Sequence, residues 1–180
     1  MRFIAITALL ATLISTPIAS AEVAAATSSN FLIQTEFHVD AAPAKVWRDL
    51  TRINHWWSAE HTYSGDASNL RLDARAGGCW CERWGHDQSV EHARVVTVME
   101  RDGVRTLRAI GGLGPLQEMG VTGVLTFTVT PHANGANVII NYRVSGDPSL
   151  NLDQVAIFVD SVLMDQMERL RRYSTSGTSD

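Results

Sequence analysis

Residues 79–84 hold the densest group of chemically capable side chains in this sequence, Cys-Trp-Cys-Glu-Arg-Trp, in a segment that reads as a β-strand. Because successive side chains of a strand point to opposite faces, Trp80, Glu82 and Trp84 share one face and the cysteines share the other. The tryptophan face could hold a planar ligand between two rings, with Glu82 as a hydrogen-bond acceptor or general base. Ordinary core packing, with Glu82 paired to an arginine, is the alternative. Glu82 is therefore only a weak catalytic candidate, because no spacing fixes a partner for it.

Cys79 and Cys81 are the only two cysteines of the chain. With His86 or His92 they would offer the thiolate and imidazole ligands that zinc prefers. Specific zinc motifs repeat the cysteine or histidine pair, and no second pair is present in this sequence, so we predict no metal and no cofactor. A disulfide is the other outcome, although Cα atoms two residues apart in a flat strand lie about 7 Å from each other, at the upper limit for an unstrained bridge.

Three further features bear on a binding site. Trp56 and Trp57 follow a short helical segment, and we expect Trp56 to anchor it to the sheet and Trp57 to close one end of a cavity. Gln166 lies in an apolar helical stripe, where a buried amide needs a partner, so it either bonds the sheet or faces a ligand. The glycine-rich residues 111–117 lack the Lys-Ser or Lys-Thr of a phosphate-binding loop and favour a mobile lid over the cavity.

Hydrophobic periodicity predicts the elements that must position these residues. Residues 31–39 alternate between apolar and polar side chains as a half-buried strand does, and two short helices follow within residues 43–58. The apolar stripe of residues 150–173 recurs at helical spacing and predicts one long helix with a single buried face. Six further strands are expected at residues 70–73, 79–84, 90–99, 104–110, 121–130 and 138–144.

The order of these elements predicts an α+β fold. Consecutive strands with short turns pair antiparallel, and the terminal helix is the only element large enough to cover their apolar face. We expect a helix-grip architecture, a curved sheet of about seven strands wrapped around the C-terminal helix, with a cavity between them. The predicted ligand-binding residues are Trp57, Trp80, Glu82, Trp84, Phe127, Tyr142, Leu163 and Gln166.

Composition narrows the function further. Of 180 residues, 45% are hydrophobic and 19% are charged, which favours one folded domain over disorder. The formal net charge of −4 gives no basic field for a phosphate backbone, so no nucleic-acid partner is expected. Lys45 is the only lysine and lies early in an amphipathic segment, so Schiff-base chemistry is not expected. The sequence contains no Gly-x-Ser-x-Gly motif, so nothing in it indicates a serine nucleophile of that type.

Residues 1–21 are typical of a signal peptide, with Arg2 before an apolar run and Ala19-Ser20-Ala21 as a small-x-small cleavage site. The apolar run is shorter than the roughly 20 residues that a bilayer span needs, and we expect no stable membrane span after cleavage. We therefore expect an exported protein, periplasmic in a Gram-negative bacterium and otherwise secreted. Residues 22–29 are expected to be a flexible lead-in, 30–173 the folded domain, and 174–180 a flexible tail.

Several of these motifs together resemble the START-like helix-grip superfamily, also known as SRPBCC. The resemblance rests on residues 42–47 (Ala-Pro-Ala-Lys-Val-Trp), 56–57 (Trp-Trp), 77–82 (Gly-Gly-Cys-Trp-Cys-Glu) and 166–170 (Gln-Met-Glu-Arg-Leu), and covers residues 30–173. The polyketide cyclases and the homologues of the Hsp90 ATPase activator are the most similar branch. The resemblance implies a pocket for an apolar or aromatic molecule, and in some branches cyclase, dehydratase or hydrolase chemistry. A chaperone-activating role does not fit an exported chain.

Three functions follow from the sequence. The first is an exported protein that binds a hydrophobic or aromatic small molecule. The second is a polyketide cyclase- or dehydratase-like enzyme in the same pocket, which would use Glu82 with Tyr142 or a histidine for acid-base chemistry. The third is an interaction module whose core is filled by side chains.

Cleavage after Ala21 makes a direct prediction. The mature protein isolated from its native source should begin at Glu22, as N-terminal sequencing would show. Material that retains Met1 would contradict the signal-peptide interpretation.

Overall fold

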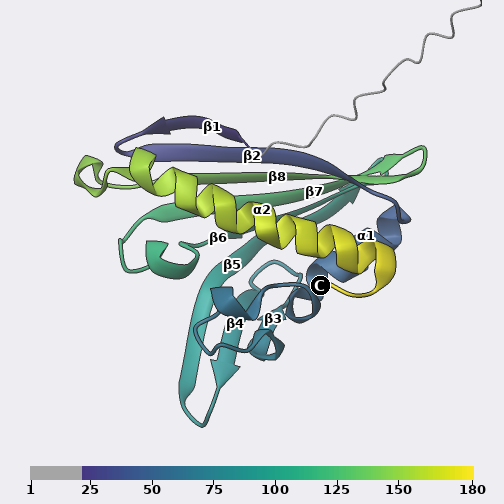
Figure 1. Ribbon diagram of the computed structural model, residues 1–180, viewed down its shortest axis with the longest axis horizontal. Helices are drawn as coiled ribbons and strands as arrows, with labels where there is room; N and C mark the ends of the chain where they lie inside the picture. Colours follow the sequence, from purple (N-terminus) through teal and green to yellow (C-terminus); the bar gives the residue numbers. More distant parts are fainter. Residues whose placement is uncertain (1–21) are drawn as a thin grey trace, which may run out of the picture.

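One antiparallel sheet of eight strands wraps around a long helix in the computed structural model, which describes residues 22–180 (Figure 1). The predicted signal peptide lies outside the described residues. The strands follow the spatial order β1-β2-β8-β7-β6-β5-β4-β3. Their bounds are β1 Glu22–Thr27, β2 Asn30–Val39, β3 Leu70–Leu72, β4 Cys79–Trp84, β5 Gln88–Arg101, β6 Val104–Ile110, β7 Thr122–His132 and β8 Gly135–Ser145.

Two α-helices and five short 3₁₀ turns complete the described part of the chain, residues 22–180. The helices are α1, Pro43–Thr51, and α2, Leu152–Ser176; the turns are η1 Ile53–His55, η2 Ala59–His61, η3 Ala67–Asn69, η4 Gly114–Leu116 and η5 Pro148–Leu150. In Figure 1, α2 runs across one face of the sheet, with α1 near its C-terminal end. This arrangement confirms the helix-grip prediction. Among residues 22–180, no helix is long and apolar enough to cross a membrane.

The central strands form because their side chains alternate cleanly. Along β7, Leu125, Phe127 and Val129 are buried while the threonines between them are only half-buried. Phe127 stands opposite Ile140 of β8 in the register, so the two strands share one apolar face. That face packs against the stripe of α2 that contains Leu163 and Leu170.

The predicted lead-in over residues 22–29 is wrong. Glu22–Thr27 form β1, which pairs antiparallel with β2 and raises the strand number from about seven to eight. The segment is rich in alanine and lacks the alternation that marks a half-buried strand. Backbone hydrogen bonds to the otherwise open edge of β2 determine its structure, and these do not depend on side-chain pattern.

The predicted tail over residues 174–180 is also corrected, because α2 continues to Ser176. Lys45 donates from Nζ to the backbone oxygen of Ser174 at 2.6 Å, which satisfies a carbonyl of the last helical turn. Gly177 then ends the helix at φ 88°, and Arg169 pairs with Asp180 at 3.0 Å. The single lysine therefore has a structural role between α1 and α2.

The close approach of the Gly111 backbone and the Tyr142 ring makes Gly123 a stability-determining position. A Cβ there would collide with the backbone oxygen of Gly111 and the ring of Tyr142. We expect Gly123→Ala to lower the free energy of unfolding by about 1–3 kcal/mol, the usual cost of overpacking, in urea denaturation. Thr122→Ala, at the exposed neighbouring position, is the matched control; equal stability of the two variants would contradict this account.

Candidate functional site

A cavity of about 590 Å³ lies beside the first half of α2. Its walls come from α2, from residues 57–63, from the loop at 113–119 and, from the sheet, His92 of β5. The lining residues are Trp57, Glu60, His61, Thr62, Tyr63, His92, Leu113, Gly114, Pro115, Leu116, Glu118, Met119, Val155, Phe158, Val159, Val162 and Leu163. Loops rather than strands thus form most of the wall opposite the helix.

The segment at residues 58–64, which includes lining residues of the cavity, is held at each end by a buried side chain. Gln166, fully buried on α2, accepts a 2.7 Å hydrogen bond at Oε1 from the backbone N–H of Ser58. Its Nε2 lies 3.2 Å from Nδ1 of His61. The prediction that Gln166 needs a polar partner is confirmed. Its partners are Ser58, directly before η2, and His61, the last residue of η2, so Gln166 neither bonds the sheet nor faces the cavity.

Glu82 fixes the other end of the same segment. Its side chain is fully buried, and its carboxylate accepts hydrogen bonds from the backbone N–H groups of Tyr63 at 3.0 Å and Ser64 at 2.5 Å. A third contact, at 3.1 Å, joins Oε2 to Nε2 of His92. Glu82 does not line the cavity, so it reaches a ligand only through His92. The sequence had left its partner open; the structure supplies a histidine.

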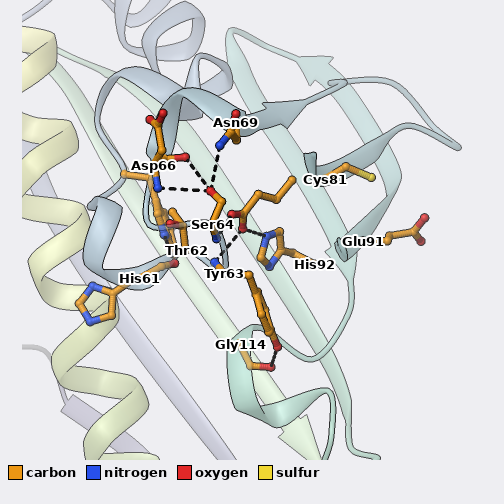
Figure 2. Close-up of polar contacts among 12 residues, drawn as sticks. His61, Thr62, Tyr63, Ser64, Asp66, Asn69, Cys81, Glu91, His92 and Gly114 are labelled. Atoms are coloured by element: carbon orange, nitrogen blue, oxygen red, sulfur yellow. Dashed lines mark hydrogen bonds and ion pairs between the residues drawn. The ribbon is translucent and has the colours of Figure 1, made fainter. Parts of the chain in front are cut away.

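An irregularity in β5 turns His92 inward. Trp80 stands opposite Ala93 and Cys81 opposite Glu91, so the register shifts between these pairs and His92 is the extra residue of a β-bulge. His92 and Ala93 are consequently both buried, which strict alternation would forbid. Figure 2 shows His92 between Ser64 and the ring of Tyr63, whose centroid lies 5.8 Å from that of the imidazole.

The pKa values of this pair shift downward for different reasons. Burial alone would raise the pKa of Glu82, but the hydrogen bonds from Ser64, Tyr63 and His92 outweigh it and hold the pKa below 4.5. Burial lowers the pKa of His92 below 6.5, and the attraction of Glu82 offsets this only in part. Near neutral pH the site therefore contains an ionised carboxylate beside a neutral imidazole.

Tyr142 positions the loop that covers the cavity. Its hydroxyl donates to the backbone oxygen of Gly111 and accepts from the N–H of Leu113, both at 3.1 Å. Burial raises its pKa to about 12, so it stays protonated. Tyr63 holds the same loop from outside by donating from its hydroxyl to the backbone oxygen of Gly114 at 3.1 Å. Residues 113–116 of the predicted lid line the cavity.

Of the eight predicted ligand-binding residues, Trp57 and Leu163 line the cavity. Trp80 lies behind Trp57, with ring centroids 5.0 Å apart, and Phe127 belongs to the core. Trp84 is half-buried at the end of β4 and does not line the cavity. The others stand one layer back, where they hold the lining residues in place: Glu82, Tyr142 and Gln166. Trp56 is fully buried in the core, and its Nε1 donates to the backbone oxygen of Asp49 at 3.0 Å, a contact with α1 and not with the sheet.

The cysteines lie on the outer face of β4, as the alternation predicted. Cys79 and Cys81 form a disulfide with Cα atoms 5.3 Å apart, well inside the usual range. The separation is shorter than that of a flat strand, and the register shift of β4 against β5 falls at the same place, between Trp80 and Cys81. Glu91 brings a carboxylate close to both sulfurs, but a disulfide leaves no thiolate for a metal. Cys81 and Glu91 point away from the cluster around Ser64 in Figure 2.

Sequence reasoning missed several lining residues, among them Tyr63, His92, Met119 and Phe158. His92 could be predicted as a lining residue only by assuming a bulge, because regular alternation from the buried Val95 places His92 on the outer face of the sheet. Phe158 stands on the polar side of the helical stripe and is 74% exposed. An aromatic residue at such a position is a further indication of a cavity mouth.

Comparison with solved structures identifies the architecture. DynU16, a protein of the dynemicin biosynthetic locus, is 16% identical with a TM-score of 0.54, over 82% of this chain and 48% of its own. CalU16 from Micromonospora echinospora is 14% identical with a TM-score of 0.51, over 80% of this chain and 74% of its own. MLL2253 from Mesorhizobium loti is 15% identical with a TM-score of 0.53, over 78% of this chain and 94% of its own. These likenesses show a shared helix-grip fold.

No protein-family model matches the chain, and no curated protein matches it. The chemistry of the cavity must therefore be argued from its own residues.

The buried carboxylate generates a pH-dependent stability prediction. Because the folded-state pKa of Glu82 is lowered, its stabilisation is present above pH 4.5 and is lost as the pH falls through the folded-state value. We expect Glu82→Gln to lower the free energy of unfolding by about 2–4 kcal/mol near neutral pH. The difference from the wild type should shrink in acid, where Glu82 itself is protonated.

Urea denaturation across the acidic range measures both effects. Glu36→Gln, an exposed carboxylate on β2, is the matched control and should change stability by less than about 0.5 kcal/mol. A Glu82→Gln deficit that stays constant down to the lowest pH would contradict a role for the ionised form.

Proposed function

We propose that this protein binds a hydrophobic small molecule that carries no negative charge, in the cavity beside α2. The observation that carries the proposal is the cavity itself, about 590 Å³ and lined mainly by aliphatic and aromatic side chains. That volume lies within the range of about 300–1,000 Å³ usual for small-molecule sites. An interaction module with a filled core is disfavoured for the same reason.

Charge argues against an acidic ligand. Among residues 22–180, the lining contains no lysine or arginine, whereas Glu60 and Glu118 contribute carboxylates. The pKa of Tyr63 is raised by burial and, beyond that, by Glu118 and Glu82, which indicates a negative field inside the cavity. A carboxylate or phosphate group buried here would have no cation to pair with, at a cost of several kcal/mol. Neutral molecules and amines meet no such penalty.

Aromatic surface favours a planar ligand. Trp57 contributes a nearly buried indole at the inner end, and its orientation is fixed by a 2.9 Å hydrogen bond from Nε1 to the backbone oxygen of His61. Phe158 and the half-exposed Tyr63 stand nearer to solvent. Rings at both depths can pack against a flat apolar molecule along its length.

The cellular setting and the family belong to this proposal as well. Export through residues 1–21 is compatible with the fold, because cleavage after Ala21 leaves β1 complete. The shared helix-grip fold supports placing the chain in the START-like superfamily, and a polyketide cyclase-like branch remains our proposal from the motif resemblance. The Cys79–Cys81 disulfide suits an oxidising compartment.

A pair of dyes that differ by one charge tests the ligand class. Phenylnaphthylamine is neutral, whereas anilinonaphthalene sulfonate has the same aromatic body with an added anion. We expect the neutral dye to bind at least about tenfold more tightly, corresponding to about 1.4 kcal/mol, in fluorescence titrations. Equal or reversed affinities would contradict the charge argument.

A cavity-filling variant tests the location. Val159→Trp places an indole where a lining side chain of α2 stands, and should abolish binding of the neutral dye while the protein remains folded. Ser161→Trp adds the same group at an exposed position of α2 outside the lining and should leave binding unchanged. Binding that survives Val159→Trp would place the dye elsewhere.

A further inference from the structure

The two nitrogens of His92 have different surroundings, and the difference determines the tautomer. Nε2 lies 3.1 Å from the carboxylate of Glu82, and an ionised carboxylate only accepts hydrogen bonds. A neutral imidazole carries one N–H, so that proton must be on Nε2 and the lone pair on Nδ1. No group of residues 22–180 forms a hydrogen bond to Nδ1, on a ring that lines the cavity.

This arrangement is that of an oriented base. Glu82 has no exposed surface and is held by two backbone donors as well as by His92, so it fixes the imidazole ring rigidly. If Nδ1 takes up a proton, the imidazolium that forms stands directly against a carboxylate, which stabilises it.

We propose that the cavity also catalyses proton abstraction, with His92 as the general base and Glu82 as its positioning residue. The inference rests on the proposed binding function and adds a substrate class: a neutral, flat, apolar molecule with a C–H bond next to a carbonyl or a C=N group. Nδ1 takes the proton, and the electron pair of the C–H bond moves into the neighbouring unsaturated group. The same nitrogen returns the proton to another atom of the molecule, so isomerisation needs no co-reactant.

Nitrobenzisoxazole is a suitable probe because it is neutral, aromatic and opened by base. Removal of its carbon-bound proton forms a C≡N bond, breaks the N–O bond and releases a coloured cyanonitrophenolate, while the proton stays on the base until it exchanges with water. We expect saturable turnover above the buffer rate. His92→Gln, whose amide can still donate to Glu82, should lower kcat by about 100-fold or more and leave KM largely unchanged.

His38→Gln is the matched control, since His38 is an exposed histidine of β2 outside the cavity, whose ring meets that of His132 edge-on. It should retain the wild-type rate. Loss of activity in His38→Gln to the same degree, or unchanged activity in His92→Gln, would overturn the assignment. Wild-type protein that binds the probe without turning it over would overturn this inference and leave the proposed binding function intact. Protein that does not bind it would contradict both.

The pH dependence of the reaction rate distinguishes a positioning role of Glu82 from a role in packing alone. The rate should rise to a plateau with a midpoint below pH 6.5, because only neutral His92 accepts a proton and burial lowers its pKa. Glu82→Gln should lower the plateau at least about tenfold and move the midpoint to lower pH, since no carboxylate then stabilises the imidazolium. The titratable groups that face His92 or share its cavity are Glu82, Tyr63, Glu60, His61 and Glu118. An unchanged midpoint in a folded Glu82→Gln protein would contradict the positioning role.

Discussion

The requirement to satisfy one buried carboxylate organises the site. Glu82 has no exposed surface, and an ionised carboxylate so placed costs several kcal/mol unless donors surround it. Its donors come from two separate parts of the chain, the backbone of Tyr63 and Ser64 and the ring of His92. The carboxylate therefore ties a loop to the sheet, and the lining residues beside that loop take their places as a consequence.

Gln166 does the same from the opposite side. It belongs to α2, yet its amide binds Ser58 and His61 at the start of the segment whose end Glu82 holds. The segment between is thus fixed to helix and sheet at once, and neither contact occupies the cavity. A wall held at both ends loses little conformational freedom when a ligand arrives, which favours binding. The glycine-rich loop opposite has its own anchor in Tyr142.

The sequence was sufficient for the architecture because periodicity survives without tertiary information. Alternation along β7 and the stripe along α2 both identify an inner face, and the fold follows from covering it. β1 was missed because its pairing depends on backbone groups. In the site, the sequence indicated which residue types face inward but not how far each lies from the cavity. Alternation places Trp80 and Glu82 on the inner face, yet only the packing of Trp57 in front of Trp80 shows which of the two tryptophans lines the cavity.

The register shift between β4 and β5 links the two faces of the sheet. On the inner face it adds a residue to β5, which turns His92 toward Glu82. On the outer face it falls between Trp80 and Cys81, where the strand is shorter than a flat one and the two cysteines approach to 5.3 Å. Because Trp80 stands between the cysteines and packs against Trp57, the disulfide braces the strand behind the cavity. The disulfide on the outer face and the contact between His92 and Glu82 on the inner face therefore lie at the same departure from regular pairing.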